Sequence, residues 1–140
     1  MMKEDEFEKL VIESIGELPE YFRKKMENIT IHIEDFPDYN ILKQLGHHSP
    51  YSILGLYQGI PVTRRGVHYR NVMPDRILIF RKPILRKSRY RPEIKNEIKR
   101  VVLHEVGHYF GLSEQELYLI EKNSLTPQGK IKNNSEKSAQ

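Results

Sequence analysis

The segment that most constrains how this 140-residue chain folds is residues 92–111, PEIKNEIKRVVLHEVGHYFG. Proline is favoured in the first turn of a helix, and glycine is favoured just beyond the last turn. Between them, apolar residues recur at helical spacing. The segment therefore predicts a long helix from Pro92 to about Phe110, and the rest of the fold must pack against it.

This predicted helix carries the pattern His-Glu-x-x-His, at His104, Glu105 and His108. At about 100° per residue the two histidines lie roughly 40° apart on one face, so both imidazoles can reach one metal ion. Glu105 lies on the same side, where a carboxylate can contact a metal-bound water. The chain has no cysteine, so a metal site must use His, Asp or Glu, and two neutral imidazoles suit zinc.

Glu114 is the best candidate for a third ligand, provided that the helix breaks before it. A continuous helix would carry Glu114 about 240° round from His108, away from the metal. Gly111 permits such a break, because glycine adopts the left-handed conformation readily. Glu114 also fits the first turn of a following helix capped by Ser113, so the alternative third ligands Glu116 and Glu121 stay open. The remaining histidines are expected to be ordinary polar residues, namely His32, His47, His48 and His68.

Periodicity and turn residues also predict the elements outside this helix. We expect helices over residues 4–15, 19–26 and from 113 onward, and strands over residues 29–35, 53–57, 62–63 and 76–80. The run at 76–80 is apolar on both faces, which indicates a central strand. We expect residues 1–124 to form a single α+β domain, and residues 125–140, rich in polar residues, to be a flexible C-terminal tail.

The net charge of +4 is distributed unevenly, because residues 64–100 hold 13 of the 23 basic side chains and 3 of the 19 acidic ones. Within residues 81–91, six of eleven residues are basic and none is acidic. We expect this basic segment to be a solvated loop between a strand and the long helix. The acidic N-terminus and the lack of a long apolar run predict no membrane segment and a cytoplasmic location.

At its histidine motif the chain resembles the minimal zincin-like metallopeptidases, a family of small single-domain proteins. The resemblance covers roughly residues 7–122, with similar blocks at residues 12–37, 53–61, 74–80 and 102–117. It implies an α+β zincin-like fold, in which a short twisted mixed sheet packs against the active-site helix, with an N-terminal and a C-terminal helix. It also implies one Zn²⁺ per chain bound by His104, His108 and Glu114, with Glu105 as the general base.

The chain departs from the larger metzincins in two respects. They have a methionine turn after the motif, whereas the last methionine here is Met73, and they carry histidine where this chain has Glu114.

Two functions are consistent with the sequence. The first is zinc-dependent hydrolysis of a peptide or protein substrate, in which the strand at 53–57 holds an extended peptide at a sheet edge. The alternative is a non-catalytic or regulatory metal-binding module whose basic segment, residues 81–91, binds nucleic acid or another acidic partner. Of these partners nucleic acid is the less favoured, because a charge run is most often a solvated surface.

Overall fold

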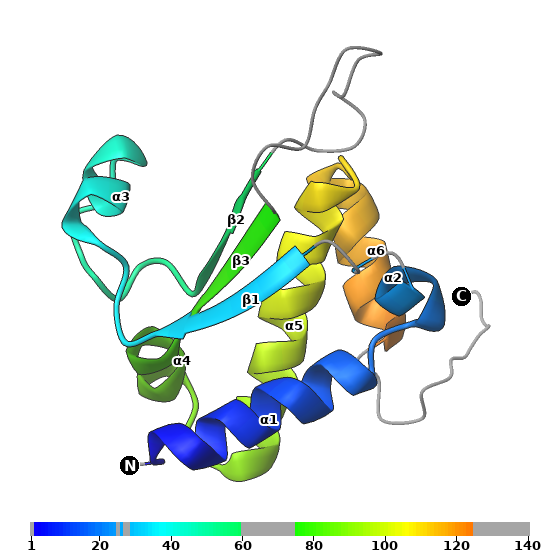
Figure 1. Ribbon diagram of the computed structural model, residues 1–140, viewed down its shortest axis with the longest axis horizontal. Coiled ribbons are helices and arrows are strands. Elements are labelled where there is room, and N and C mark those ends of the chain that lie inside the picture. Colours follow the sequence, from blue (N-terminus) through cyan, green and yellow to red (C-terminus); the bar gives the residue numbers. More distant parts are fainter. Residues whose placement is uncertain (1, 25, 27–28, 60–74, 125–140) are drawn as a thin grey trace.

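The fold is α+β, and the computed structural model describes it over residues 2–24, 26, 29–59 and 75–124. Figure 1 shows the helices and strands of this part of the chain. In order they are α1 (Glu4–Gly16), α2 (Glu20–Lys24), β1 (Ile29–Glu34), α3 (Tyr39–Gln44), β2 (Gly55–Gln58), β3 (Asp75–Phe80), α4 (Arg81–Lys87), α5 (Arg91–Tyr109) and α6 (Glu114–Ser124).

The three described strands form one mixed sheet in the order β1-β3-β2. β1 runs parallel to β3 and pairs Ile31 with Ile77, while β2 runs antiparallel to β3 and pairs Tyr57 with the same Ile77. β3 is therefore the central strand, as its continuous apolar run predicts. β1 and β2 lie at the two edges of the described sheet.

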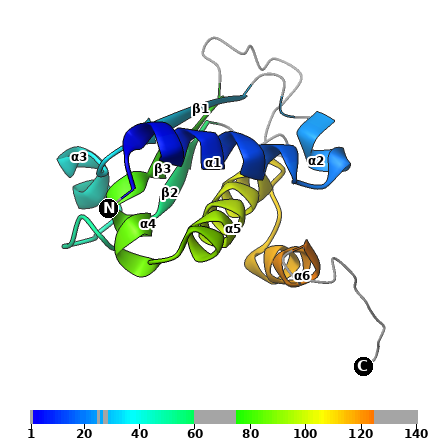
Figure 2. The ribbon, with the colours of Figure 1, turned by 90° about the horizontal axis from the view of Figure 1, so that it is seen from below.

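One face of the sheet is covered by α1 and α5, as the two views in Figures 1 and 2 show. Ile77 and Ile79 of β3 point to this face and are fully buried with Phe7 of α1 and Ile98 of α5. Leu78 and Phe80 alternate to the opposite face, where they join Leu42 of α3 and Ile53 in a smaller cluster. The larger core thus fixes α5 against the sheet.

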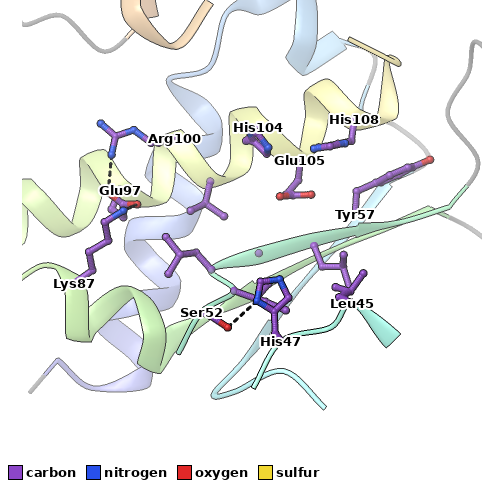
Figure 3. A pocket seen from close by; sticks show the side chains of 15 residues that line it. Leu45, His47, Ser52, Tyr57, Lys87, Glu97, Arg100, His104, Glu105 and His108 are labelled. Atoms are coloured by element: carbon purple, nitrogen blue, oxygen red, sulfur yellow. Dashed lines mark hydrogen bonds and ion pairs between the residues drawn. The ribbon is translucent and has the colours of Figure 1, made fainter. Parts of the chain in front are cut away.

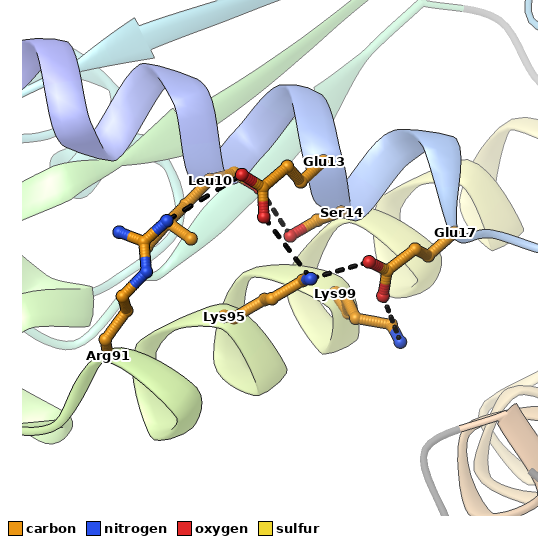
Figure 4. Close-up of polar contacts among 7 residues, drawn as sticks. All are labelled: Leu10, Glu13, Ser14, Glu17, Arg91, Lys95 and Lys99. Carbon is orange, nitrogen blue, oxygen red and sulfur yellow. Dashed lines mark hydrogen bonds and ion pairs between the residues drawn. The ribbon is translucent and has the colours of Figure 1, made fainter.

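Ion pairs join α1 to the outer side of α5, as Figure 4 shows. Lys95 Nζ lies 2.6 Å from a Glu17 oxygen and 3.3 Å from a Glu13 oxygen, and Lys99 Nζ lies 3.1 Å from Glu17. Glu13 of α1 and Glu17, which directly follows α1, therefore meet basic residues of the segment that is richest in positive charge.

Most predicted elements are confirmed, with small shifts at their ends. The long helix is α5, with 19 residues, and the strand predicted at 53–57 is β2, displaced toward Gln58. The strand predicted at 62–63 and the tail predicted at 125–140 lie outside the residues that the structure describes.

The expectation of a solvated loop over residues 81–91 is wrong for its first seven residues, which form α4. Pro83 lies in the first turn, where its missing N–H costs no helical hydrogen bond, and Ile84 is fully buried in the core. Arg81 is only 6% exposed, with its Nε 2.9 Å from Asp35 and one Nη donating to the Met2 carbonyl. Arg81 therefore serves the fold rather than an external anion.

Candidate active site

His104 and His108 project from one side of α5, one helical turn apart, toward β2 (Figure 3). Their ring centroids lie 4.8 Å apart. One potential ligand atom from each of His104, Glu105 and His108 lies within 4.8 Å of the others. Burial, followed by the charge of His104, lowers the pKa of His108 below its usual value. A neutral imidazole is the form that binds a metal ion.

The helix ends just beyond this pair, and Gly111 makes the turn with φ of 73°. The N–H of Gly111 donates to the His108 carbonyl at 3.0 Å, and the N–H of Leu112 donates to the Gly107 carbonyl at 3.0 Å. These two bonds form a Schellman motif, in which glycine favours the left-handed position. The break predicted at Gly111 is confirmed, and it reverses the chain toward the histidines.

The first residue of α6 after this turn, Glu114, lies against both histidines. One carboxylate oxygen lies 3.5 Å from His104 Nε2 and 3.7 Å from His108 Nε2. Ligand atoms that share a tetrahedral zinc ion with bonds of about 2.0–2.1 Å lie roughly 3.3 Å apart. The Glu114 oxygen therefore lies about as far from each imidazole as two ligands of one zinc ion lie from each other, and the Glu114 side chain is exposed enough to adjust.

The two alternative third ligands are placed differently. Glu116 closes the capping box predicted at Ser113: its carboxylate accepts from the Ser113 N–H at 2.8 Å, while Ser113 Oγ accepts from the Glu116 N–H at 3.1 Å. The hydrogen bond from the Ser113 backbone N–H lowers the pKa of Glu116, and the Ser113 side chain acts in the same direction. The side chain of Glu121 lies outside the described part of the structure. Among the described residues, Glu114 is thus the carboxylate of α6 that meets both imidazoles.

Glu105 has the same chemistry as Glu114 but lies in a buried setting, 8% exposed, between α5 and β2. Desolvation raises the pKa of its carboxyl to about 7, although the charge of His104 and a hydrogen bond from the Tyr57 backbone act in the opposite direction. Gly55 makes this close approach possible, because a Cβ there would collide with Val101 and lie 3.5 Å from Glu105 Cγ. The carboxylate of Glu105 is thereby held beside the histidines at the sheet edge.

The edge strand β2 turns part of its backbone toward this site. Phe80 N–H donates to the Leu54 carbonyl at 3.0 Å, in the same register that pairs Leu56 with Leu78. Hydrogen-bonded pairs alternate along an antiparallel ladder, so the backbone groups of Gly55 and Tyr57 point away from β3. The Tyr57 N–H donates to the Glu105 carboxylate, so the edge groups that would face an added peptide strand include those of Gly55.

A pocket of about 430 Å³ lies along α5 and β2 and includes His104, Glu105 and His108 in its wall. His47 enters the same pocket from the loop after α3, with its Nδ1 2.9 Å from Ser52 Oγ. No local pattern assigns a role to His47, because only the tertiary fold brings this loop to α5. His32, in contrast, is exposed on β1 as expected, and His68 lies outside the described residues.

A small mixed sheet packed on a helix with a His-Glu-x-x-His segment is the arrangement of the zincin class of metal-dependent hydrolases. A comparison with protein families agrees with this class: the family model of zincin-like metallopeptidases matches residues 26–123. The chain therefore belongs to the zincin-like metallopeptidase family. No curated protein gave a significant match to the chain. None of the helices in the described part of the chain has the length and apolar character needed to cross a membrane.

Proposed function

We propose that this protein is a zinc-dependent peptidase in which His104, His108 and Glu114 bind one zinc ion and Glu105 is the general base. The observation that carries the proposal is the placement of the two glutamates. The Glu114 carboxylate lies 3.5 and 3.7 Å from the two imidazoles, while Glu105 lies beside the same histidines in the pocket wall. One carboxylate is thus placed to bind the metal and the other to exchange a proton.

The chemistry follows from these positions. A zinc ion in such a site supplies Lewis-acid chemistry, which lowers the pKa of a water toward neutrality and polarises a carbonyl oxygen. Glu105 accepts the proton of the attacking water and later delivers it to the amine that leaves. The outward backbone groups of Gly55 hold the substrate at the edge of β2, which fixes the scissile bond beside Glu105.

The first prediction tests the general base with Glu105→Gln. The amide has nearly the shape of the carboxylate but cannot accept the proton, so we expect stoichiometric zinc to remain and peptide hydrolysis to fall by at least about 100-fold. Zinc is measured by elemental analysis of the purified protein, and hydrolysis by mass spectrometry of a defined peptide mixture. The matched control is Glu8→Gln, an exposed residue of α1, which we expect to keep both properties. Unchanged turnover in Glu105→Gln would refute the assignment.

A further inference from the structure

The active-site pocket extends beyond the histidines along α5 to a second group of charged residues. Figure 3 shows Glu97 and Arg100 of α5 at this end, together with Lys87 from the last turn of α4. All three line the same pocket as His104, Glu105 and His108. Lys87 belongs to the basic segment 81–91, so part of that segment faces the candidate active site.

Among the described residues at this far end of the pocket, two cations meet one carboxylate. Glu97 is buried, 5% exposed, and accepts from an Arg100 Nη at 2.8 Å, while Lys87 Nζ lies 3.3 Å from its other oxygen. The Lys87 and Arg100 side chains themselves remain 57% and 47% exposed. One buried carboxylate thus holds two partly exposed cations at this end of the pocket.

The distance along α5 from His104 to the charged residues can be compared with the length of an extended peptide. Arg100 and Glu97 precede His104 by four and seven residues of α5, which corresponds to about 6 and 10 Å along the helix. An extended peptide advances about 3.3 Å per residue, so these distances span two or three residues. The wall between the two ends is largely apolar, with Leu54 and Val101 among its residues. Uncharged substrate residues suit this middle section, and an anion suits the far end.

We propose that Lys87 and Arg100 form an anion subsite that selects peptides with a carboxylate two or three residues from the scissile bond. The carboxylate belongs either to an Asp or Glu side chain or to the end of the peptide. This inference rests on the proposed function, because the bond to be cut is defined by the candidate zinc site. It assigns a substrate class to the pocket.

The test uses peptide hydroxamates, because a hydroxamate binds zinc and anchors the peptide at the metal whether or not hydrolysis occurs. One series places Asp or Asn at the first, second, third or fourth residue from the hydroxamate, on either side of it. A second series compares a free terminal carboxylate with the terminal amide at the same lengths. Affinities for the zinc-loaded full-length protein are measured by calorimetry at low and at high salt.

We expect the acidic probe to bind about fivefold more tightly than its amide counterpart at the second or third position. This preference should shrink at 0.5 M salt, because the cations are partly exposed. Lys87→Gln and Arg100→Gln should each reduce the preference to about twofold or less, and Lys87→Glu should favour a Lys-bearing probe. Arg89→Gln is the matched control, since Arg89 is an exposed basic residue of the same segment outside the pocket wall, and it should keep the preference.

The possible outcomes separate the two proposals. Equal affinities for acidic and neutral probes at every position would overturn the anion subsite and leave the zinc site standing. A preference that persists in Lys87→Gln and Arg100→Gln would also overturn the subsite as assigned. If no hydroxamate binds the zinc-loaded protein, the proposed metal centre fails and the subsite fails with it. Should Arg100→Gln destabilise the fold by leaving Glu97 with one partner, Lys87→Glu still provides the decisive comparison.

Discussion

Two glutamates of the candidate site differ in environment rather than in chemistry. Glu105 is 8% exposed and surrounded by α5 and β2, whereas the Glu114 side chain is 73% exposed at the start of α6. Burial favours the protonated form of a carboxyl group, and an exposed carboxylate stays ionised and free to adjust toward a cation. The raised pKa of Glu105 therefore suits a group that accepts and returns a proton, and the exposed carboxylate of Glu114 suits a metal ligand.

Substitution of Glu114 tests the third ligand directly. In Glu114→Ala we expect zinc affinity to fall by at least about 100-fold, because even the loss of a residue that only orients a ligand costs 10- to 100-fold. Competition with a chromophoric chelator measures this affinity. Glu116→Ala is the matched control: it removes the hydrogen bond that the Glu116 carboxylate accepts from the Ser113 N–H but should keep tight zinc binding. Stoichiometric, tightly bound zinc in Glu114→Ala would place the third ligand elsewhere.

At the level of elements, the position of α6 depends on a close contact with α5. Gly107, which lies inside the histidine motif, has no side chain, and a Cβ there would collide with the side chain of Leu117. Leu117 is fully buried. The contact lets α6 pack directly on α5, and Glu114, three residues before Leu117, is set by the same packing.

A double-mutant cycle tests this coupling. Gly107→Ala should push α6 outward, lowering both the thermal midpoint and the zinc affinity, because it moves Glu114 away from the histidines. Leu117→Ala alone should cost about 2 to 5 kcal/mol of stability through the cavity it leaves. In the double variant the new methyl group occupies part of that cavity, so we expect it to lose clearly less than the sum of the two single changes. Strict additivity would contradict the proposed contact.

At the level of the whole molecule, the ion pairs between α1 and α5 make stability depend on pH. The hydrogen bond from Lys95, together with the nearby Lys99, lowers the pKa of Glu17 despite some desolvation. A depressed carboxyl pKa contributes stability above the unfolded-state value of about 4.3, and that contribution is lost as the pH falls through the folded-state pKa.

The corresponding prediction compares the wild-type protein with Glu17→Gln. At pH 7 and low salt the wild type should be the more stable of the two, and the difference should shrink as the pH falls from about 5 to 3. Denaturant unfolding at a series of pH values measures the difference, and 1 M salt should reduce it at pH 7. Glu8→Gln, on the exposed side of α1, should show no such trend. A difference that is independent of both pH and salt would argue against the ion pairs.

The sequence predicts those features that depend on local pattern. The span of α5, the central strand β3, the break at Gly111 and the cap at Ser113 each follow from periodicity or from one residue's backbone preference. The sequence does not predict the helix α4, because its density of charge suggests a solvated loop, while its core contacts, among them Pro83 and Ile84, depend on tertiary packing.

The candidate site also combines residues that local sequence pattern predicts with residues whose position depends on tertiary packing. Both histidines and Glu105 are recognisable from spacing along one helix, and Glu114 from the glycine that precedes it. The approach of His47 and Lys87 to the pocket depends on how separate segments pack, and one sequence carries no local signal for such contacts. The small size required at Gly55 and Gly107 is likewise imposed by neighbours from other elements.

Because of the turn at Gly111, metal binding would change the local stability of α6. The proposed ligands lie on both sides of this turn, so a bound ion would act as a reversible cross-link between α5 and α6. By mass action, a change that favours local unfolding of α6 would lower the affinity for the ion. Binding of the ion would in turn suppress fraying of α6. Protection of the α6 amides against hydrogen exchange would then report occupancy of the site, even in a variant that cuts nothing.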